Sequence, residues 1–342
     1  MDERDAQLIL RAQRGLPLER EPFAALGRGL GMDEDAVLAR LRAAFARGEA
    51  RRLGAVFEPE ALGYRTALAA LRLPEARVDG AAAALAADPG VTHCYLRGWP
   101  AELPPDAEGA PRGRTVPNLW FTFGAPAGVF ESALDALGRR AAGAAPLILP
   151  AVRRFRVEAI FDPAARSAAP AAPASGRPAR SGGPPPPLAE SDRRLVIALQ
   201  GHLALDRRPF DRAAAEAGLE PEAALAHMRR WMADGILRRI ALVVRHRRLG
   251  VLANAMCAWD VPPGGADAAG PRLAAQEGVS HCYLRARREA FPFDLYAMIH
   301  APDWPAAHAR FAAAARAAGL RDGLFLGSTR EYKKTSMAFF AT

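Results

Sequence analysis

The sequence predicts an α+β fold, a tandem repeat in which each unit joins a winged helix-turn-helix to a ferredoxin-like α/β sandwich. Two observations lead to this prediction. The pentapeptide HCYLR occurs at 93–97 and again at 281–285, inside stretches that match nearly from end to end. Each copy also shows three short helical patterns and a strand, followed by elements in the order β-α-β-β-α-β. The 342 residues therefore form two similar units related by duplication.

The first unit shows where each element is expected. Helical periodicity covers, in order, 5–13, 19–30 and 33–47. Pro22 fits the first turn of the second helix and Gly31 the turn before the third, and 51–57 is expected to be the wing strand. The sandwich is expected as a strand at 64–73, a helix at 78–88, strands at 91–97 and 118–124, a helix at 128–141 and a strand near 152–161.

A segment rich in Pro, Ala, Gly and Ser separates the two copies. It has almost no large apolar residues, so it cannot bury enough surface to fold and is expected to be a flexible linker. We therefore place winged helix-turn-helix domains at 1–58 and 191–245, ferredoxin-like domains at 59–162 and 246–342, and the linker at 163–190.

Composition limits the class of protein. No apolar run approaches the roughly 20 residues that span a bilayer, and the N-terminus does not resemble a signal peptide. Cys94, Cys257 and Cys282 lack C-x-x-C spacing and are expected to be buried as small apolar side chains. We expect a cytoplasmic protein with no membrane partner. The net charge of +9 favours an acidic partner, either nucleic acid or a molecule with several carboxylates, unless the arginines are simply solvated.

The HCYLR strands separate polar from apolar side chains. Alternate residues of a strand share a face, so Cys282 and Leu284 are expected to face the core. His281, Tyr283 and Arg285 then share the opposite face, as do His93, Tyr95 and Arg97 in the first copy. Such a trio offers a proton donor, a phenol and a cation, which suits an acidic substrate. The alternative is a network of polar groups at an interface.

The two copies differ at other candidate positions. His246 aligns with Pro59, His300 with Gly124, and Arg245 with Glu58. This asymmetry predicts that the second ferredoxin-like domain carries the chemistry while the first completes the fold and the pocket. Chance degeneration of one copy would give the same pattern. His202, His227 and His308 are expected to be ordinary surface or packing residues.

DNA binding is the main alternative for a helix-turn-helix protein. A recognition helix places its first residues beside phosphates. Here the helices at these positions begin with acidic residues, Asp33, Glu34 and Asp35 in one unit and Glu220 and Glu222 in the other. These carboxylates disfavour DNA, although acids at a helix N-terminus also simply complement the helix dipole.

The layout resembles the Lrp/AsnC regulators, and more specifically the siroheme decarboxylases in their fused two-unit (D–L type) form. The resemblance covers almost all of the chain apart from the linker. It rests on Pro22-Phe23, Arg51-Arg52, VTHCYLR, NLWFT, RH at 245–246, NAM at 254–256, SHCYLR and AMIH at 297–300.

The resemblance implies a carboxy-lyase. Its reaction removes CO2 from the C12 and C18 acetate side chains of siroheme and gives 12,18-didecarboxysiroheme. This product is a precursor of heme d1 and also serves an alternative route to heme. No cofactor beyond the iron tetrapyrrole substrate is implied, and no metal site of the protein's own. Pairing of the two internal units is expected, with a homodimer as a further option. An Lrp-like regulator that senses a small ligand and a tetrapyrrole carrier without turnover remain as alternatives.

Residue roles follow as hypotheses. We expect His246 and His281 to flank the reacting acetate, with His300 nearer the substrate iron. Substrate carboxylates are expected to be held by Arg245, Arg247, Tyr283 and Arg285 of the second unit and by His93 and Arg97 of the first.

Overall fold

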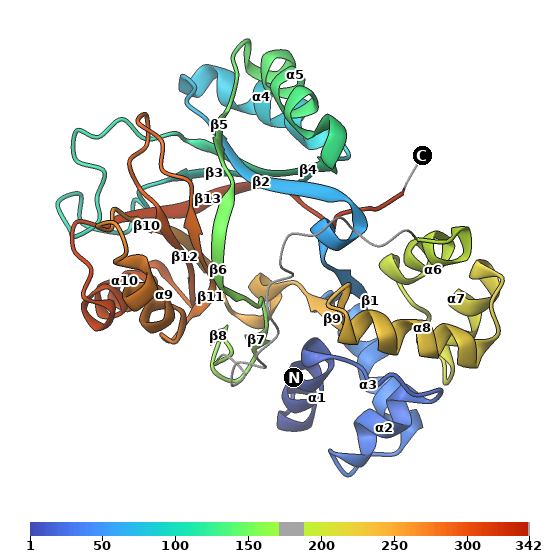
Figure 1. Ribbon diagram of the computed structural model, residues 1–342. Coiled ribbons are helices and arrows are strands. Elements are labelled where there is room, and N and C mark those ends of the chain that lie inside the picture. The colour runs from blue at the N-terminus through green and yellow to red at the C-terminus, as the bar shows by residue number, and fades with distance from the viewer. Residues whose placement is uncertain (171–187, 341–342) are drawn as a thin grey trace.

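The computed structural model describes residues 1–170 and 188–340 and confirms the tandem architecture (Figure 1). The first helix-turn-helix consists of α1 (Glu3–Arg14), α2 (Pro22–Arg28), α3 (Glu34–Ala46) and the wing strand β1 (Ala50–Phe57). The second consists of α6 (Glu190–Gln200), α7 (Pro209–Ala217), α8 (Pro221–Ala233) and β9 (Leu237–Val244). Asp2 and Asp33 cap α1 and α3 by accepting backbone N–H bonds, which satisfies free donors at the helix starts.

The two helix-turn-helix domains dock on each other. Their wing strands β1 and β9 pair antiparallel, and one apolar core runs through both domains. Two reciprocal hydrogen bonds tie the helices across this interface. Arg42 on α3 donates to the carbonyl of Leu205, and the equivalent Arg229 on α8 donates to the carbonyl of Leu18. The two units are therefore related by a pseudo-twofold axis within one chain.

Each sandwich contains the predicted helices and strands. The first has η1 (Pro59–Leu62), β2 (Tyr64–Leu71), α4 (Glu75–Ala87), β3 (Val91–Gly98), β4 (Leu119–Pro126), η2 (Ala127–Val129) and α5 (Phe130–Ala142). The second has η3 (His246–Leu249), β10 (Ala253–Trp259), α9 (Ala266–Ala274), β11 (Val279–Arg285), β12 (Leu295–Ala301) and α10 (Trp304–Ala318). The helix pairs cover the outer faces of the sheet and bury separate cores there (Figure 1).

The last strand of each unit crosses to the other unit, which the sequence did not predict. In the first unit β5 (Leu147–Leu149) pairs with β2, the chain passes Pro150, and β6 (Ala151–Val157) pairs with β11 of the second unit. In the second unit the single strand β13 (Leu324–Lys334) pairs first with β10 and then with β3 of the first. The sheet of nine strands thus begins at β5 and ends at β6, which are consecutive along the chain.

The predicted linker at 163–190 needs correction at both ends. The chain forms a small hairpin from β7 (Phe161–Asp162) and β8 (Ser167–Ala168), and the side chains of Ser167 and Ala168 are buried. Small side chains need little apolar area to pack, so low hydrophobicity did not mark this part as folded. At the other end, α6 already begins at Glu190. The rest of the predicted linker, 171–187, lies outside the described residues. None of the helices in the described ranges has the length and apolarity to cross a bilayer.

Candidate active site

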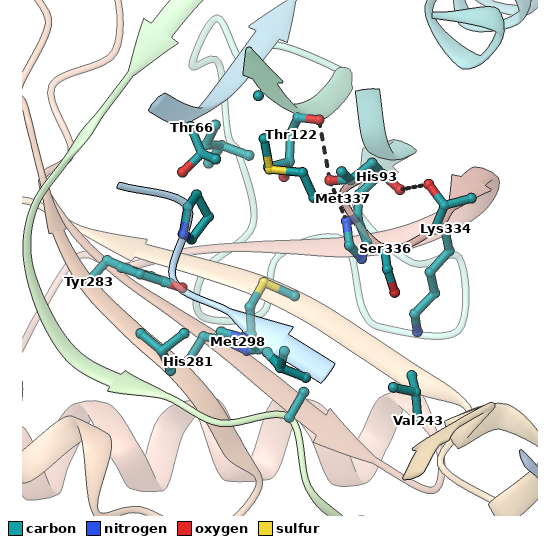
Figure 2. A pocket seen from close by; sticks show the side chains of 18 of the residues that line it. Thr66, His93, Thr122, Val243, His281, Tyr283, Met298, Lys334, Ser336 and Met337 are labelled. Atoms are coloured by element: carbon teal, nitrogen blue, oxygen red, sulfur yellow. Dashed lines mark hydrogen bonds between the residues drawn. The ribbon is translucent and has the colours of Figure 1, made fainter. Parts of the chain in front are cut away.

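A cavity of about 520 Å³ lies between the two units. We call the cavity-facing side chains of β2, β3 and β4 the first wall and those of β10, β11 and β12 the second wall. The wing strands β1 and β9, the crossing strands β6 and β13 and the segments that follow them complete the lining. Figure 2 shows His93 and Thr122 of the first wall, His281, Tyr283 and Met298 of the second, and Lys334 at the end of β13.

The two HCYLR strands face the cavity as their alternation predicts. His93, Tyr95 and Arg97 line the first wall, and His281, Tyr283 and Arg285 line the second. In each copy the guanidinium lies over the phenol ring, at 5.0 Å in the first wall and 4.7 Å in the second. The intervening cysteines are fully buried on the opposite face, and burial raises the pKa of both thiols to about 12.

A β-bulge adds a residue that the sequence analysis missed. In β11 Val279 pairs with Ile299 and His281 with Met298, so Ser280 is an extra residue in the strand. Its Oγ lies 2.8 Å from His281 Nδ1 and 2.7 Å from His300 Nε2. The hydroxyl therefore links the two histidines. The only sequence signal is the hydroxyl residue that precedes histidine in both copies.

The first wall has the same bulge, but its hydrogen bonds connect fewer side chains. Thr92 is the extra residue of β3, and its Oγ1 lies 3.0 Å from His93 Nδ1. No second histidine follows, because Gly124 stands where the second wall has His300. Met337, from the segment after β13, fills the space beside this glycine (Figure 2).

His246 is near the site but not among the residues that line it. Its ring is buried, stacks on Phe161 at 5.1 Å and lies 5.8 Å from the ring of His300. Lys334 Nζ donates to His246 Nδ1 at 2.7 Å. The structure therefore brings His246, His281 and His300 into one region, in which three lining residues, Phe161, His300 and Lys334, surround His246.

The cations of the cavity are only partly those that the sequence analysis selected. Arg97 and Arg285 line it, whereas Arg245 and Arg247 are exposed and do not. Arg245 instead donates to the carbonyls of Gly48 and Ala50. Among the described residues the lining contains eight cationic side chains and one carboxylate, Glu58. The other cations of the lining are Arg51 and Arg52 on β1, Arg154 on β6, Arg238 and Arg239 on β9, and Lys334.

Four of these six cations share one signal in the sequence, the Arg-Arg pair in each wing strand. Such a pair is ordinarily expected to be solvated, and only the docking of the two wings turns it toward a cavity. The negative charge of Glu58 is already paired within the protein, because its Oε1 accepts from Arg154 Nη1 at 2.6 Å.

Arg97, which is buried, and Arg285, which is half-buried, have only neutral partners in the described part of the chain. Arg97 Nη1 donates to Ser328 Oγ at 2.8 Å, and Arg285 Nη1 donates to the carbonyl of Leu149 at 2.7 Å. The Nε groups of both arginines are buried without a hydrogen-bond partner there. Because buried cations are ordinarily paired, this arrangement suits an anionic ligand.

The same environment keeps the histidines neutral. Burial, with help from neighbouring cations, lowers the pKa of His93, His246 and His281 to about 3, and that of His300 well below its usual range. Burial also lowers the pKa of Lys334 to about 8. In the empty cavity at neutral pH, positive charge therefore resides on arginine and lysine, while the imidazoles are uncharged. Within the described ranges, no group of His, Cys, Asp and Glu is placed to hold a metal ion.

Comparison with known proteins agrees with this architecture. A model of the AsnC-like ligand binding domain matches residues 61–156 and 248–333, and a model of the siroheme decarboxylase NirDL-like HTH domain matches 5–49 and 192–238. The siroheme decarboxylase NirDL subunit of Paracoccus pantotrophus is 38% identical over 308 residues, which cover 88% of this chain and 86% of that protein. The siroheme decarboxylase of Hydrogenobacter thermophilus is 29% identical over 334 residues, 96% of this chain and 92% of its own.

Solved structures extend the comparison to three dimensions. The crystal structure of the siroheme decarboxylase NirDL matches with a TM-score of 0.71 and 26% identity, over 99% of this chain and 95% of the other. The crystal structure of NirDL in co-complex with an iron-uroporphyrin III analogue matches with a TM-score of 0.70. Because these matches extend over both units, they show that the chain belongs to the siroheme decarboxylase family. It has the fused form, in which one chain joins two units, each made of a helix-turn-helix and an AsnC-like domain.

Proposed function

We propose that this chain removes CO2 from the C12 and C18 acetate side chains of siroheme and gives 12,18-didecarboxysiroheme, for heme d1 or an alternative heme. The observation that carries the proposal is the cavity between the units, whose lining combines eight cations with neutral histidines. Its relatives are named siroheme decarboxylases, and one related structure holds an iron-uroporphyrin III analogue. The proposal needs no cofactor beyond the iron tetrapyrrole itself.

Substrate binding falls to the arginines. Siroheme carries many carboxylates, and guanidinium groups bind carboxylates through paired, charge-assisted hydrogen bonds. Arg97 and Arg285 hold one carboxylate each from opposite walls, since neither has an acidic partner in the described part of the chain. The Arg-Arg pairs of the two wing strands face the same space and hold further carboxylates. This assignment replaces the expected roles of Arg245 and Arg247.

The reaction requires one proton for each CO2 released. The bond between the acetate methylene and its carboxylate breaks, CO2 leaves, and the electron pair remains on the methylene carbon. That carbon takes up a proton and becomes a methyl group, so each step is redox neutral. A donor must therefore lie beside the acetate, and His281 lines the cavity in a suitable position.

Ser280 connects this donor to a second histidine. Its hydroxyl can donate to one imidazole while it accepts from the other, so a proton that leaves His281 is replaced from His300. A place for His300 nearer the substrate iron stays a prediction. His246 then supports His300 and does not touch the acetate, because it does not line the cavity.

Bound siroheme would also change the protonation of the histidines. The cations around the cavity contribute to the low imidazole pKa values. Carboxylates placed among these cations offset their charge and raise the pKa of His281 and His300. The substrate thereby brings these histidines toward the range in which imidazole serves as an acid.

Ligand-responsive DNA binding is less well supported. Arg207 of the second unit pairs with Glu34 and Asp35 at the start of α3, the first recognition helix. Arg42 and Arg229, on the two recognition helices, are likewise engaged across the interface between units. A location in the cytoplasm, where the free cysteines stay reduced, is part of the proposal. A homodimer of the fused chain stays a prediction.

The test is anaerobic incubation of the purified chain with siroheme, followed by mass analysis of the tetrapyrrole. Loss of two CO2 per siroheme is the expected result. An unchanged mass with an altered absorption spectrum would instead indicate a carrier or sensor. If neither changes, salt-dependent binding to duplex DNA becomes the next experiment.

A further inference from the structure

A cluster of three aromatic rings lies at the second wall, and two of them, Phe161 and His300, line the cavity. Phe161 stacks on His246 at 5.1 Å and meets His300 edge-on at 5.0 Å, and the two imidazoles are 5.8 Å apart. Each histidine has one ring nitrogen fixed, His246 Nδ1 by Lys334 and His300 Nε2 by Ser280. The other ring nitrogens, His246 Nε2 and His300 Nδ1, are buried without a partner in the described ranges. One hydrogen bond and the packing against Phe161 therefore hold each ring in its orientation.

The backbone of Phe161 is held from the first helix-turn-helix. Gln13, at the end of α1, is buried, with 2% of its surface exposed. Its Oε1 accepts from the Phe161 N–H at 2.9 Å, and its Nε2 donates to the Phe161 carbonyl at 2.7 Å. Both backbone groups of Phe161 are thus bound by one side chain. A residue of the first unit is in this way connected to histidines of the second.

We call this arrangement, a glutamine side chain bound to both backbone groups of a phenylalanine, the latch. The second unit contains the same latch but without the histidines. Gln200, the equivalent of Gln13, accepts from the Phe339 N–H at 2.7 Å and donates to its carbonyl at 3.1 Å. The ring of Phe339 meets Tyr64 at 5.2 Å and Phe57 at 6.1 Å, both edge-on. No imidazole lies in this ring cluster, because Pro59 and Gly124 replace His246 and His300. The chain therefore contains an equivalent pair for comparison, in which both Gln200 and Phe339 line the cavity.

We propose that Gln13 and Phe161 are positioning residues for the decarboxylation. They hold the His246 and His300 rings in the orientation that keeps His300 bonded to Ser280 and so sustains proton delivery to His281. This role rests on the proposed function. Neither residue transfers a proton, so their loss is expected to lower kcat more than it changes KM.

The first test compares Gln13→Met with Gln200→Met in the full chain. Methionine keeps the length of the side chain and removes both hydrogen bonds to the backbone. For siroheme we expect kcat to fall about tenfold in Gln13→Met, with KM within about twofold of the wild type. In Gln200→Met we expect kcat to fall only about twofold. Equal losses of kcat in the two variants, or a change confined to KM, would overturn the proposal.

A second readout does not depend on turnover. In 1H–15N spectra of the histidine rings of the empty protein, Gln13→Met should shift the signals of His246 and His300 and leave His93 in place. Gln200→Met should leave His246 and His300 in place, and shifts of equal size in the two variants would contradict the role. A wild-type chain that does not decarboxylate siroheme would refute the proposed function, whereas these spectra still decide whether the latch positions the rings.

A second pair of variants covers the case in which Gln13→Met does not fold. Phe161→Leu and Phe339→Leu keep an apolar side chain and remove one ring from each latch. The same asymmetry is expected, with the larger fall in kcat and the His246 and His300 shifts confined to Phe161→Leu. Matching behaviour of the two leucine variants would refute the positioning role.

Discussion

The two walls of the cavity come from copies of one unit, yet they have kept different side chains. Both retain the imidazole, phenol and guanidinium of HCYLR and a hydroxyl residue at the bulge. Only the second wall continues from that hydroxyl to another histidine, His300, whereas the first ends at Gly124. Groups suited to binding are thus symmetric across the cavity, and groups suited to proton transfer are concentrated on one side.

The crossing strands strengthen this difference. Lys334 on β13 lies opposite His93, and the equivalent position on β6, opposite His281, is Val157. The lysine reaches His246, so even a residue that pairs with the first wall serves the histidine cluster of the second. A tandem duplication therefore allows one copy to keep the binding groups while the other acquires the catalytic set.

The largest expected effect comes from removing the paired histidines one at a time. His281→Ala should lower kcat about 1000-fold, because it removes the imidazole that faces the cavity and continues into the relay, while His93→Ala should cost about tenfold. Steady-state decarboxylation of siroheme measures both, and the absorption spectrum of the bound tetrapyrrole serves as the control for binding. Similar losses in the two variants would mean that the walls are functionally equal.

The bulge hydroxyls offer a sharper comparison of intermediate size. Ser280→Ala breaks the link between His281 and His300 and should lower kcat about 30-fold. Thr92→Ala removes a hydroxyl that contacts only one histidine, His93, and should lower kcat about threefold. Rapid-mixing measurement of a single turnover would separate the chemical step from product release. A Ser280→Ala enzyme with the wild-type rate would show that no proton passes through the hydroxyl.

The symmetric cations should behave alike. Arg97→Met and Arg285→Met each remove a guanidinium from the cavity and should each weaken siroheme binding about tenfold. The exposed Arg248, outside the cavity, provides the control Arg248→Met. Titration of siroheme followed by absorbance gives the affinities. Strong weakening in only one of the two cavity variants would break the proposed symmetry of binding.

The smallest expected effect is on stability as a function of pH. His93, His246 and His281 have a pKa of about 3 in the folded chain and about 6.5 when unfolded. As pH falls from about 6.5 toward about 3, the unfolded chain takes up protons that the folded chain does not, so the free energy of unfolding decreases. Urea denaturation of the empty protein at several pH values measures this slope. His281→Gln should flatten the slope, with the exposed His202→Gln as control, and an unchanged slope would mean that His281 is already charged in the fold.

Much of the fold could be predicted from local patterns. The repeat, the three helices of each winged domain and the strand alternation of HCYLR depend on neighbours in the sequence, and the structure contains all of them. The crossing of β6 and β13 could not be predicted, because a strand pattern reports an element and not its partner. The hairpin at Phe161 was missed since its small side chains follow the composition of a linker.

The site was predictable only where one strand determines it. His93 and His281 and their neighbours follow from alternation within a strand. Ser280 required a bulge, which reverses the face expected from period two. Arg51 and Arg238 enter the cavity only because two wings dock, and the stacking of His246 on Phe161 joins residues of different units. These are long-range arrangements that no local pattern contains.

The most direct test of the unequal walls is the mass of the tetrapyrrole that His93→Ala produces when siroheme is incubated with excess enzyme under anaerobic conditions. If the second wall carries out both decarboxylations, His93→Ala still removes two CO2 from each siroheme, only more slowly than the wild type. A product that stops after the loss of one CO2 would contradict the account, because each wall would then perform one of the two reactions.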